Sequence, residues 1–554
     1  MFITKKKISG KEYYYLQKSI RDGNKIKSKM VAYLGKSKEE AEKKAEEIKN
    51  QYNEENEKEI KRPANLQHKK ISIDELASFC KRKGFVYPSG EIYGGLGGFW
   101  DFGHLGVELK NNIKNEWWKY HTRREDVVGI DGSIITNPKV WEASGHVASF
   151  TEIAVKCKKC GYKTKIDKHE LTARCEKCQG EYENERIFNP MFTTQIGPIK
   201  ENSLISYLRP ETAQLIFSDF KLIHENSRLQ LPFGIAQIGK AFRNEISPRE
   251  FLFRAREFEQ MELEFFVNPK IKCSYMEEIK NIYILIYDEK SQLEKKEPKL
   301  MDIYESYKKG IIKTDWHAYW IAKEYEWFVS LGANPDNFRV RQHKGDEKSH
   351  YSIETWDLEY LFPMGWKELQ GFANRGDFDL SQHQKYSKTN LSIDNNGEKI
   401  LPHVICEPSL GVERAFLVFM LDSYFYDEKR ENIVLKLNPK LAPIKAAIFP
   451  IIKKPEYEEM AKIIVGDLKK EFNVIYDKSG SIGRRYSRND EIGTPYCITI
   501  DEQSLKDKTI TIRDRNTTEQ VRVKTSELKE VMRKVVNEGK SILDFGKKIS
   551  TRVK

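Results

Sequence analysis

Residues 234–266 read GIAQIGKAFRNEISPREFLFRAREFEQMELEFF, and this stretch decides which fold the chain can adopt. Both ends alternate apolar and polar residues, which is typical of half-buried strands. The basic segment between them is broken by Pro248 and predicts a long loop joining two antiparallel strands. Four arginines lie at or near the loop: Arg243, Arg249, Arg254 and Arg256. Burying an unpaired charge on a half-buried strand costs free energy, so such strands rarely carry clustered arginines. Guanidinium groups, by contrast, form strong hydrogen bonds with phosphate oxygens. The cluster therefore predicts a polyphosphate site; the alternative is a solvated basic hairpin.

The bulk composition describes a large globular protein with an uneven positive charge. The chain has 554 residues, 39% of them hydrophobic, enough for several domains with a sizeable core. Its net charge is +12, and residues 1–36 hold ten Lys/Arg against two acidic residues. This imbalance favours a polyanionic partner. No apolar run is long enough for a signal peptide or a bilayer span, so we expect a cytoplasmic protein with no membrane partner.

Four of the eight cysteines form two CxxC pairs with fourteen residues between them. This spacing predicts a closed, structural Zn²⁺ site of four thiolates, which offers no open position for Lewis-acid chemistry. Paired thiols of this kind also favour a reducing compartment. The predicted ligands are Cys157, Cys160, Cys175 and Cys178.

FRNE (242–245) followed by RAREF (254–258) resembles motif 2 of the class II aminoacyl-tRNA synthetases. By that resemblance Arg243 grips the α-phosphate of ATP and Glu245 lies near the adenine amino group. Arg254 reaches the far phosphates, and Phe258 stacks on adenine. These four residues form the first half of an expected ATP site.

The strand VICEPSLGVER (404–414) resembles motif 3, in which the final arginine, here Arg414, packs against the γ-phosphate. Glu368, on the alternating strand KELQGF (367–372), is expected to hold Mg²⁺ on the ATP phosphates. The resemblance thus implies ATP and Mg²⁺ as ligands. The expected catalytic residues are Arg243, Glu245, Arg254 and Arg414.

Motif 3 normally reads Gly-x-Gly-x-Gly, but here the alternate positions are Glu407, Ser409 and Gly411. Alternate residues of a strand share one face, so all three look into one pocket. The larger groups exclude amino-acid side chains, and a carboxylate attracts an ammonium group, which favours glycine. The run EIYGGLGGFWDFGHLG (91–106) resembles a stretch specific to the glycyl-tRNA synthetases.

The resemblance extends to the rest of the glycine pocket. Glu211, in the run YLRPETAQ (207–214), is expected to surround the ammonium group together with two further glutamates, and Arg209 is a candidate for carboxylate or phosphate. Arg375 is expected beside Glu368, with a salt bridge to Asp377 or Asp379 as the alternative. The expected glycine-binding residues are Arg209, Glu211, Glu262, Arg375, Glu407 and Ser409.

Two segments at the start of the chain carry local predictions. Residues 1–36 alternate aromatic and basic residues around a turn at Asp22–Asn24 between two short strands, and either bind nucleic acid or form a solvated hairpin. An amphipathic helix is predicted from Ile71 to Lys83. The helix Val107–Tyr120 and a strand reaching Asn137-Pro138 resemble motif 1, which forms the dimer interface in the family.

From Leu441 onward, short apolar strands alternate with helices, which predicts an α/β domain with a mixed sheet. The run SGSIGRRYSRNDEIGTPY (479–496) resembles the anticodon-binding domain of the glycyl, prolyl, threonyl and histidyl enzymes. Arg484, Arg485 and Arg488 are candidates for tRNA contacts. A solvated basic turn is the alternative.

The predicted fold class is an α+β core, with an antiparallel sheet flanked by helices, plus a zinc-binding insertion and a C-terminal α/β anticodon-binding domain. The expected boundaries are a basic aromatic module at 1–36, a charged helix and linker at 37–66, a catalytic domain at 67–440 with a zinc insertion at 150–190 and a helical insertion at 269–333, and the anticodon-binding domain at 441–554.

The resemblance covers about residues 71–550 and implies a homodimeric glycine–tRNA ligase with glycine, ATP and tRNA(Gly) as partners. The alternative is another class II enzyme, such as a prolyl or threonyl synthetase. Glu407, Ser409 and the 91–106 run argue against it. A non-catalytic relative that only binds RNA has no need for the complete set of nucleotide residues.

Overall fold

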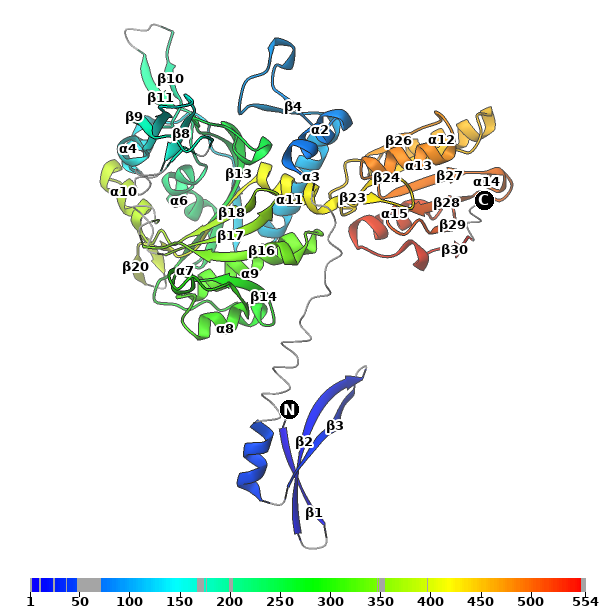
Figure 1. Cartoon of the computed structure of the whole chain (residues 1–554), viewed down its shortest axis with the longest axis horizontal. Helices are drawn as coiled ribbons and strands as arrows, with labels where there is room; N and C mark the ends of the chain where they lie inside the picture. The colour runs from blue at the N-terminus through cyan, green and yellow to red at the C-terminus, as the bar shows by residue number, and fades with distance from the viewer. Residues whose placement is uncertain are drawn as a thin grey trace. The chain divides into compact units, whose positions relative to one another are not determined.

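The structure is a computed structural model and consists of two compact units, Met1–Lys70 and Ile71–Lys554 (Figure 1). We describe each unit by itself. The described residues are 2–8, 11–22, 25–35, 37–46, 71–166, 174–175, 177–198, 203–345, 347, 354–395 and 397–549.

The first unit is a three-stranded antiparallel sheet with a short helix. Its strands are β1 (Phe2–Ile8), β2 (Lys11–Asp22) and β3 (Lys25–Gly35), in that order across the sheet. Residues 38–46 are helical. The buried core consists of Leu16, Leu34, Ala41 and Ala45. The sequence predicted two strands here, and β1 is the one it missed; Asp22 pairs with Lys25 at the predicted turn. Residues 47–66 of the predicted linker lie outside the described residues.

A ten-stranded sheet forms the centre of the second unit, in the order β15-β14-β16-β17-β18-β22-β13-β12-β6, with β21 also paired to β13. Only β12–β6 and β14–β16 are parallel pairs, so the sheet is mixed but mainly antiparallel, close to the predicted antiparallel sheet. Its strands are β6 (Val127–Ile130), β12 (Phe233–Phe242), β13 (Glu257–Val267), β14 (Tyr283–Tyr287), β15 (Lys299–Asp302), β16 (Phe338–Gln342), β17 (Thr355–Phe362), β18 (Gly365–Ala373), β21 (His403–Val404) and β22 (Glu407–Gly411).

The largest core lies on one face of this sheet. Along β13, Met261, Leu263 and Phe265 are buried in a cluster with Trp117 and Trp320. Because successive residues of a strand point to opposite faces, Gln260, Glu262 and Glu264 belong to the other face. That face carries the candidate site. The helices around the sheet are α2 (Ile73–Lys83), α3 (His104–Thr122), α6 (Ala213–Ser227), α9 (Asp315–Ser330), α10 (Phe378–Ser387) and α11 (Val412–Ser423).

The helices α2 and α3 confirm the two predicted near the start of the second unit, but the strand expected to reach Asn137-Pro138 is wrong. β6 ends at Ile130, and Pro138 begins α4 (Pro138–Ala143). The Asn137 side chain caps this helix by accepting a hydrogen bond from the Lys139 backbone N at 3.0 Å. Proline is favoured at the first helical position because its missing N–H would have no partner there.

The insertion at 269–333, expected to be helical, contains strands as well. Besides α7 (Glu289–Leu293), α8 (Ile303–Lys308) and α9, it supplies β14 and β15, which extend the main sheet. β14 reads YILIY, and β-branched and aromatic residues of this kind pack well on a pleated surface. The helical prediction overlooked this run.

The C-terminal domain is the predicted α/β structure. Its sheet has the order β26-β25-β27-β28-β29-β30, with β26, β25 and β27 parallel and the remaining pairs antiparallel. Figure 1 draws this domain in orange and red. Its elements are β25 (Ala446–Pro450), α12 (Pro455–Leu468), β26 (Val474–Tyr476), α13 (Ile482–Glu491), β27 (Tyr496–Ile500), α14 (Glu502–Asp507), β28 (Thr509–Asp514), β29 (Gln520–Lys524), α15 (Leu528–Asn537) and β30 (Lys547–Lys548).

Two arginines join the C-terminal domain to the segment that leads into it. Arg430 donates from Nη1 to Asp490 Oδ2 at 3.2 Å and to the Arg515 carbonyl at 2.8 Å. The buried Arg515 donates to the carbonyls of Gly493 and Leu437, both at 2.6 Å. Because burial disfavours its charge, the pKa of Arg515 falls to about 10. Breaking such a network leaves buried groups unpaired, so it fixes the domain firmly.

Candidate active site

The predicted pair of antiparallel strands is present as β12 and β13, with Gln237 opposite Glu262 and Phe242 opposite Glu257. Gly239 leaves room for a neighbouring arginine, because a Cβ there would lie 2.1 Å from Arg209 Nη2. The Arg209 guanidinium is buried and donates to the carbonyls of Lys240 and Gly132, each at 2.6 Å. It therefore braces β12, and its charge also interacts with Glu262, one of the acidic groups described below.

A cavity of about 250 Å³ lies where the β12–β13 loop meets β18, β22 and the start of α11. Arg243 lies near two aromatic rings, 5.7 Å from the Phe150 centroid and 5.5 Å from the Phe258 centroid, and its Nε donates to the Pro210 carbonyl. All six residues predicted for ATP line this cavity: Arg243, Glu245, Arg254, Phe258, Glu368 and Arg414.

Arg414 and Glu368 form an ion pair at one wall of the cavity, with 3.2 Å between Arg414 Nη1 and Glu368 Oε1. The charge of Arg414 is the main reason that the pKa of Glu368 lies below its ordinary value, and His343 and Arg243 act in the same direction. The carboxylate is thus ionised at neutral pH. Arg414 also lies over the Phe253 ring, 4.6 Å from its centroid.

Arg375 is the centre of the second part of the site and is 2% exposed. Its Nη1 donates to both oxygens of Glu407 at 2.9 Å, and its Nε donates to Asp379 Oδ2 at 2.7 Å. The sequence predicted a position beside Glu368, or else a salt bridge to Asp377 or Asp379. The structure has the salt bridge to Asp379 together with the contact to Glu407, whereas Glu368 pairs with Arg414.

Glu262 and Glu211 complete this acidic cluster. Glu262 accepts from Ser409 Oγ at 2.7 Å and from the Thr212 backbone N at 3.0 Å. Glu211 lies 3.3 Å from His146 Nε2 and accepts from Gln214 Nε2 at 3.0 Å. The predicted residues Glu211, Glu262, Arg375, Glu407 and Ser409 are therefore together, whereas Arg209, although its charge interacts with Glu262, uses its guanidinium to bind backbone carbonyls.

The cluster places five buried carboxyl groups around one arginine: Glu211, Glu262, Glu264, Asp379 and Glu407. Burial, reinforced by the neighbouring acids, raises the pKa of Glu407 to about 8 in spite of Arg375. Burial also raises the pKa of Glu262, and that of Glu264 well above its ordinary value. Although burial opposes ionisation of Glu211 too, His146 and Arg375 hold its pKa below the ordinary value. A pocket so rich in acid is suited to a small cation.

Several members of the cluster were missed at the sequence level. Four of them lie inside the quoted runs 207–214 and 234–266, where alternation along β13 places Gln260 and Glu264 on the face of Glu262, and only His146 lies outside both runs. At the sequence level Asp379 alone was named, as the alternative partner of Arg375. The missed residues are His146, Thr212, Gln214, Gln260 and Glu264.

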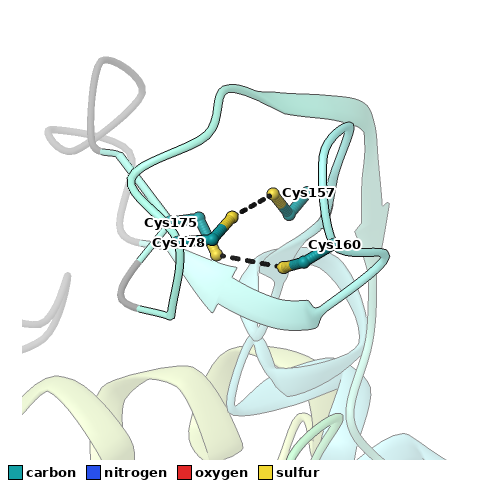
Figure 2. Close-up of side chains that lie close together, drawn as sticks. All are labelled: Cys157, Cys160, Cys175 and Cys178. Carbon is teal, nitrogen blue, oxygen red and sulfur yellow. Dashed lines mark hydrogen bonds between the residues drawn. The ribbon is translucent and has the colours of Figure 1, made fainter.

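The four predicted zinc ligands lie together in the insertion, in turns that follow β7 (Glu152–Cys157) and precede β9 (Tyr182–Phe188) (Figure 2). All four sulfurs are within 4.8 Å of one another, and the Cys157–Cys178 and Cys160–Cys175 pairs are 3.4 and 3.6 Å apart. Zinc–sulfur bonds of about 2.3 Å in a tetrahedron require sulfurs about 3.8 Å apart. The donor set and its spacing therefore fit Zn²⁺.

The insertion also contacts the β12–β13 loop. Ser247 Oγ donates to the Lys163 carbonyl at 2.7 Å, and Arg249 Nη1 donates to the Tyr162 hydroxyl at 3.3 Å. Lys177, between the second pair of cysteines, lies over the Tyr162 ring, 4.4 Å from its centroid. The cysteine turns thus brace a loop that borders the 250 Å³ cavity.

The three arginines predicted for tRNA contacts lie on α13 and differ in their surroundings. Arg485 is buried and donates to the Gly480 and Pro450 carbonyls, at 3.2 Å from Nε and 2.6 Å from Nη1. Arg488 donates from Nε to Asp477 Oδ2 at 2.6 Å. Arg484 is exposed. Of the three side chains, that of Arg484 is the most accessible to a ligand.

A mainly antiparallel sheet that carries a motif 2 hairpin and a motif 3 strand and helix around one cavity defines a class II aminoacyl-tRNA synthetase. Comparison with known proteins agrees: residues 192–424 match the tRNA synthetase class II core domain (G, H, P, S and T), and residues 445–535 match an anticodon binding domain.

The relatives that match this chain are glycine–tRNA ligases. Those of Borrelia hermsii, Treponema denticola and Bifidobacterium longum are 42%, 41% and 44% identical to it. The matches cover 86%, 84% and 81% of this chain and 100%, 97% and 90% of those proteins. The chain belongs to the glycine–tRNA ligase family.

A solved structure, prolyl-tRNA synthetase from Cryptosporidium parvum, shares the fold with a TM-score of 0.52 at 15% identity. The match covers 86% of this chain and 79% of that one. In the described part of the chain, no helix has the length and apolar character that crossing a membrane requires.

Proposed function

We propose that this chain activates glycine with ATP and transfers it to tRNA(Gly) through the cavity and the acidic cluster described above. The observation that carries the proposal is the position of Glu407 and Ser409 on β22. They contact Arg375 and Glu262 respectively, and Ser409 also borders the ATP cavity. The glycine pocket and the nucleotide cavity are therefore adjacent.

The first step needs no protein nucleophile. The carboxylate oxygen of glycine attacks the α-phosphorus of ATP, and the bond to pyrophosphate breaks. Arg243 is suited to the charge that develops on the α-phosphate, and Arg254 and Arg414 to the far phosphates, so the enzyme acts by positioning and electrostatics. In the second step a terminal ribose hydroxyl of tRNA attacks the glycyl carbonyl carbon, and AMP leaves.

We infer that the acidic cluster selects glycine by charge and by size. In the empty pocket Glu211, Glu262 and Glu407 all interact with the positive charge of Arg375. The ammonium group of the substrate adds a further positive charge there. Ser409 and Glu407 occupy the positions where a side chain on the substrate α-carbon would need room. Glycine has no such side chain, so it alone among the standard amino acids avoids overlap.

Two metal ions accompany this proposal. Glu368, half exposed and ionised, is suited to hold Mg²⁺ that arrives on the ATP phosphates. Zn²⁺ on the four cysteines would hold the two turns of the insertion together and, through Tyr162 and Lys163, support the loop that carries Ser247 and Arg249. A closed four-thiolate site supplies structure and leaves the chemistry to the cavity.

We also infer a homodimer, located in the cytoplasm. Ile134 and Ile135 are 37% and 40% exposed, and Ile135 bridges to Leu208 next to the hairpin β10 (Thr193–Ile196) and β11 (Leu204–Tyr207). That hairpin exposes Ile196, Leu204 and Ile205. Adjacent exposed apolar residues of this kind mark interaction surfaces. An Ile135→Asp chain that sediments as the same species as the wild type would contradict this interface.

The test of the function is amino-acid-dependent exchange of pyrophosphate into ATP, without tRNA, comparing glycine with alanine, serine and proline. We expect exchange with glycine alone. Exchange with another amino acid would overturn the pocket assignment. No exchange from folded, zinc-loaded protein supplied with Mg²⁺ would favour the alternative, a non-catalytic relative that binds RNA.

A further inference from the structure

Four charged side chains from three elements lie together on the face of β13 that is turned away from the acidic cluster. Lys110 and Lys114 come from α3, Glu259 from β13 and Glu413 from the first turn of α11. The side chains of Lys110, Glu259 and Glu413 are 11%, 14% and 5% exposed. We call these four residues the ion-pair cluster. None of them was predicted as a site residue.

Lys110 is the centre of the ion-pair cluster. Its Nζ donates to Glu413 Oε1 at 2.8 Å and lies 2.8 Å from Glu259 Oε2. Lys114 Nζ lies 3.2 Å from the other carboxylate oxygen of Glu259. Although burial disfavours an ammonium group, the two glutamates raise the pKa of Lys110 above its ordinary value. Lys110 therefore remains charged at neutral pH, and both carboxylates share its charge.

The Glu413 carboxylate binds β13 at the point where the pairing of two strands ends. β13 pairs with β22 as far as Gln260, which lies opposite Gly411. The next residue of β13 is Glu259, and its backbone N–H donates to Glu413 Oε2 at 2.9 Å. A hydrogen bond from an N–H to a carboxylate is stronger than one between neutral groups. Glu413 thereby fixes the first turn of α11 to β13.

This fixed point lies between two residues of the 250 Å³ cavity. Phe258 directly precedes Glu259 on β13, Arg414 directly follows Glu413 on α11, and both line the cavity. Their expected roles are to stack on adenine and to bind the far phosphates. The hydrogen bond from Glu259 to Glu413 therefore sets the separation of the groups that hold the two ends of the nucleotide.

Glu413 needs a cation to remain charged in this position. Among the described residues, Lys110 is the one cation that forms an ion pair with Glu413. Without it, Glu413 and Glu259 would be two largely buried acids, and one of them would take up a proton or move toward solvent. Either change weakens or displaces the acceptor of the Glu259 N–H. An error of about 1 Å in the position of a binding group can cost about a hundredfold in rate.

We propose that Lys110 is a positioning residue for ATP. It keeps Glu413 charged and in place, and so holds Phe258 and Arg414 at the separation that the nucleotide requires. The inference rests on the proposed function, because that function assigns the 250 Å³ cavity to ATP. It also gives α3, on the opposite face of the sheet, a part in binding the nucleotide.

The experiment uses the full chain in glycine-dependent pyrophosphate exchange, with ATP and glycine varied in turn. The main variant is Lys110→Met, which keeps most of the side-chain length and removes the charge. Lys110→Arg is the conservative variant, and a cavity of about 290 Å³ beside Lys110 leaves room for the larger guanidinium group. Lys114→Met is the matched control, because Lys114 lies one turn later on α3 and its ionic partner among the described residues is Glu259 alone.

We expect Lys110→Met to raise KM for ATP about 10–100-fold and to change KM for glycine less than about threefold. Lys110→Arg should restore KM for ATP to within about threefold of the wild type, because it restores the charge-assisted hydrogen bond to Glu413. Lys114→Met should also stay within about threefold, since a partly exposed ion pair contributes little. An unchanged KM for ATP in Lys110→Met would overturn the proposal. Equal increases in KM for ATP and for glycine would also overturn it, because they indicate a general loss of structure.

Glu413→Gln tests the same contact from its other end. It leaves Lys110 paired with Glu259, so the fold should survive even if that of Lys110→Met does not. Because both changes break one contact, the double variant Lys110→Met/Glu413→Gln should be at most about threefold worse than the worse single variant. Effects on KM for ATP that multiply would show that the two residues act separately and would overturn the proposal.

Binding of a non-hydrolysable ATP analogue, measured by calorimetry, separates this proposal from the proposed function. A wild-type chain that binds the analogue but shows no glycine-dependent exchange would reject the proposed function. The comparison of Lys110→Met with Lys114→Met is then made on the dissociation constant of the analogue. Equal dissociation constants in these two variants would reject the role of Lys110.

Discussion

Replacing Glu407 by glutamine is the most informative change in the acidic cluster. The carboxylate accepts two hydrogen bonds from Arg375, both at 2.9 Å, and is 4% exposed. Glutamine preserves the volume and one acceptor oxygen but removes the negative charge. Arg375 keeps its second partner, Asp379, at 2.7 Å. The fold should therefore survive while the pocket loses one charge that attracts the substrate ammonium group.

The expected magnitude follows from the burial of this pair. Losing one charged partner of a buried, hydrogen-bonded pair costs about 2–5 kcal/mol. Because Arg375 retains Asp379, we expect the lower end, about 2–3 kcal/mol, which above pH 8, where Glu407 is ionised, is a loss of about 30–150-fold in kcat/KM for glycine. KM for ATP should change less than threefold, since Glu407 does not line the nucleotide cavity.

The effect should depend on pH. The pKa of Glu407 is raised to about 8, so its proton is retained at neutral pH in the empty pocket, where glutamine imitates it. Wild-type kcat/KM for glycine should therefore rise with pH through about 8, and the Glu407→Gln profile should be flat there. The pH dependence of folding stability has the opposite sign to that of kcat/KM. Because the folded pKa lies above the unfolded one, this group's contribution to stability is lost as pH rises toward 8.

The assay is glycine-dependent pyrophosphate exchange from pH 6 to 9, and Glu264→Gln is the matched control. Glu264 is fully buried, and neither of its oxygens has a hydrogen-bond partner among the described residues. Burial raises its pKa well above the ordinary value, so glutamine replaces a group that is already neutral. We expect less than a threefold effect. Wild-type kinetics in Glu407→Gln, or equal losses in both variants, would refute the reasoning.

Three further predictions concern other parts of the chain. Gly239→Ala should lower the free energy of unfolding by about 1–3 kcal/mol in urea titration, because the new Cβ would lie 2.1 Å from Arg209; an unchanged midpoint would contradict this. Arg414→Ala should lower kcat/KM for ATP about 10–150-fold, the equivalent of about 1.5–3 kcal/mol for a charged hydrogen bond, and equal kinetics would remove Arg414 from the ATP site. Cys160→Ser should release zinc as measured by elemental mass spectrometry, and full metal content in that variant would disprove four-thiolate binding.

The ATP residues could be predicted because the runs that carry them resemble motifs 2 and 3 of a known family. Arg243 and Phe258 belong to two strands joined by one loop, and the antiparallel register brings the ends of those strands together. Glu407 and Ser409 were assigned to one pocket from the resemblance to motif 3 together with the two-residue period of a strand. Patterns of this kind depend only on residues near each other in the sequence, so they can be recognised before the fold is known.

Other features depend on long-range packing that no local pattern encodes. His146 reaches Glu211 from the start of the short helix α5 (His146–Ser149), 65 residues earlier in the chain. Arg209 and Arg485 looked like ligand-binding arginines, but both donate to backbone carbonyls, and a guanidinium group has the same sequence signature in either role. The strand β14, by contrast, was missed although its run YILIY has the β-branched and aromatic residues typical of a strand.

The contacts of Arg430 and Arg515 affect which lengths of tRNA the enzyme can accommodate. They hold the C-terminal domain to the segment that leads into it, Arg430 through Asp490 and Arg515 through Leu437, and so stiffen the joint between the domains. A flexible hinge would let the domains move to fit tRNA molecules of different lengths. A stiff joint does not move in this way, so the tRNA itself must change shape to fit. An anticodon stem one base pair too long would then have to bend, and its deformation energy would count against it as a substrate.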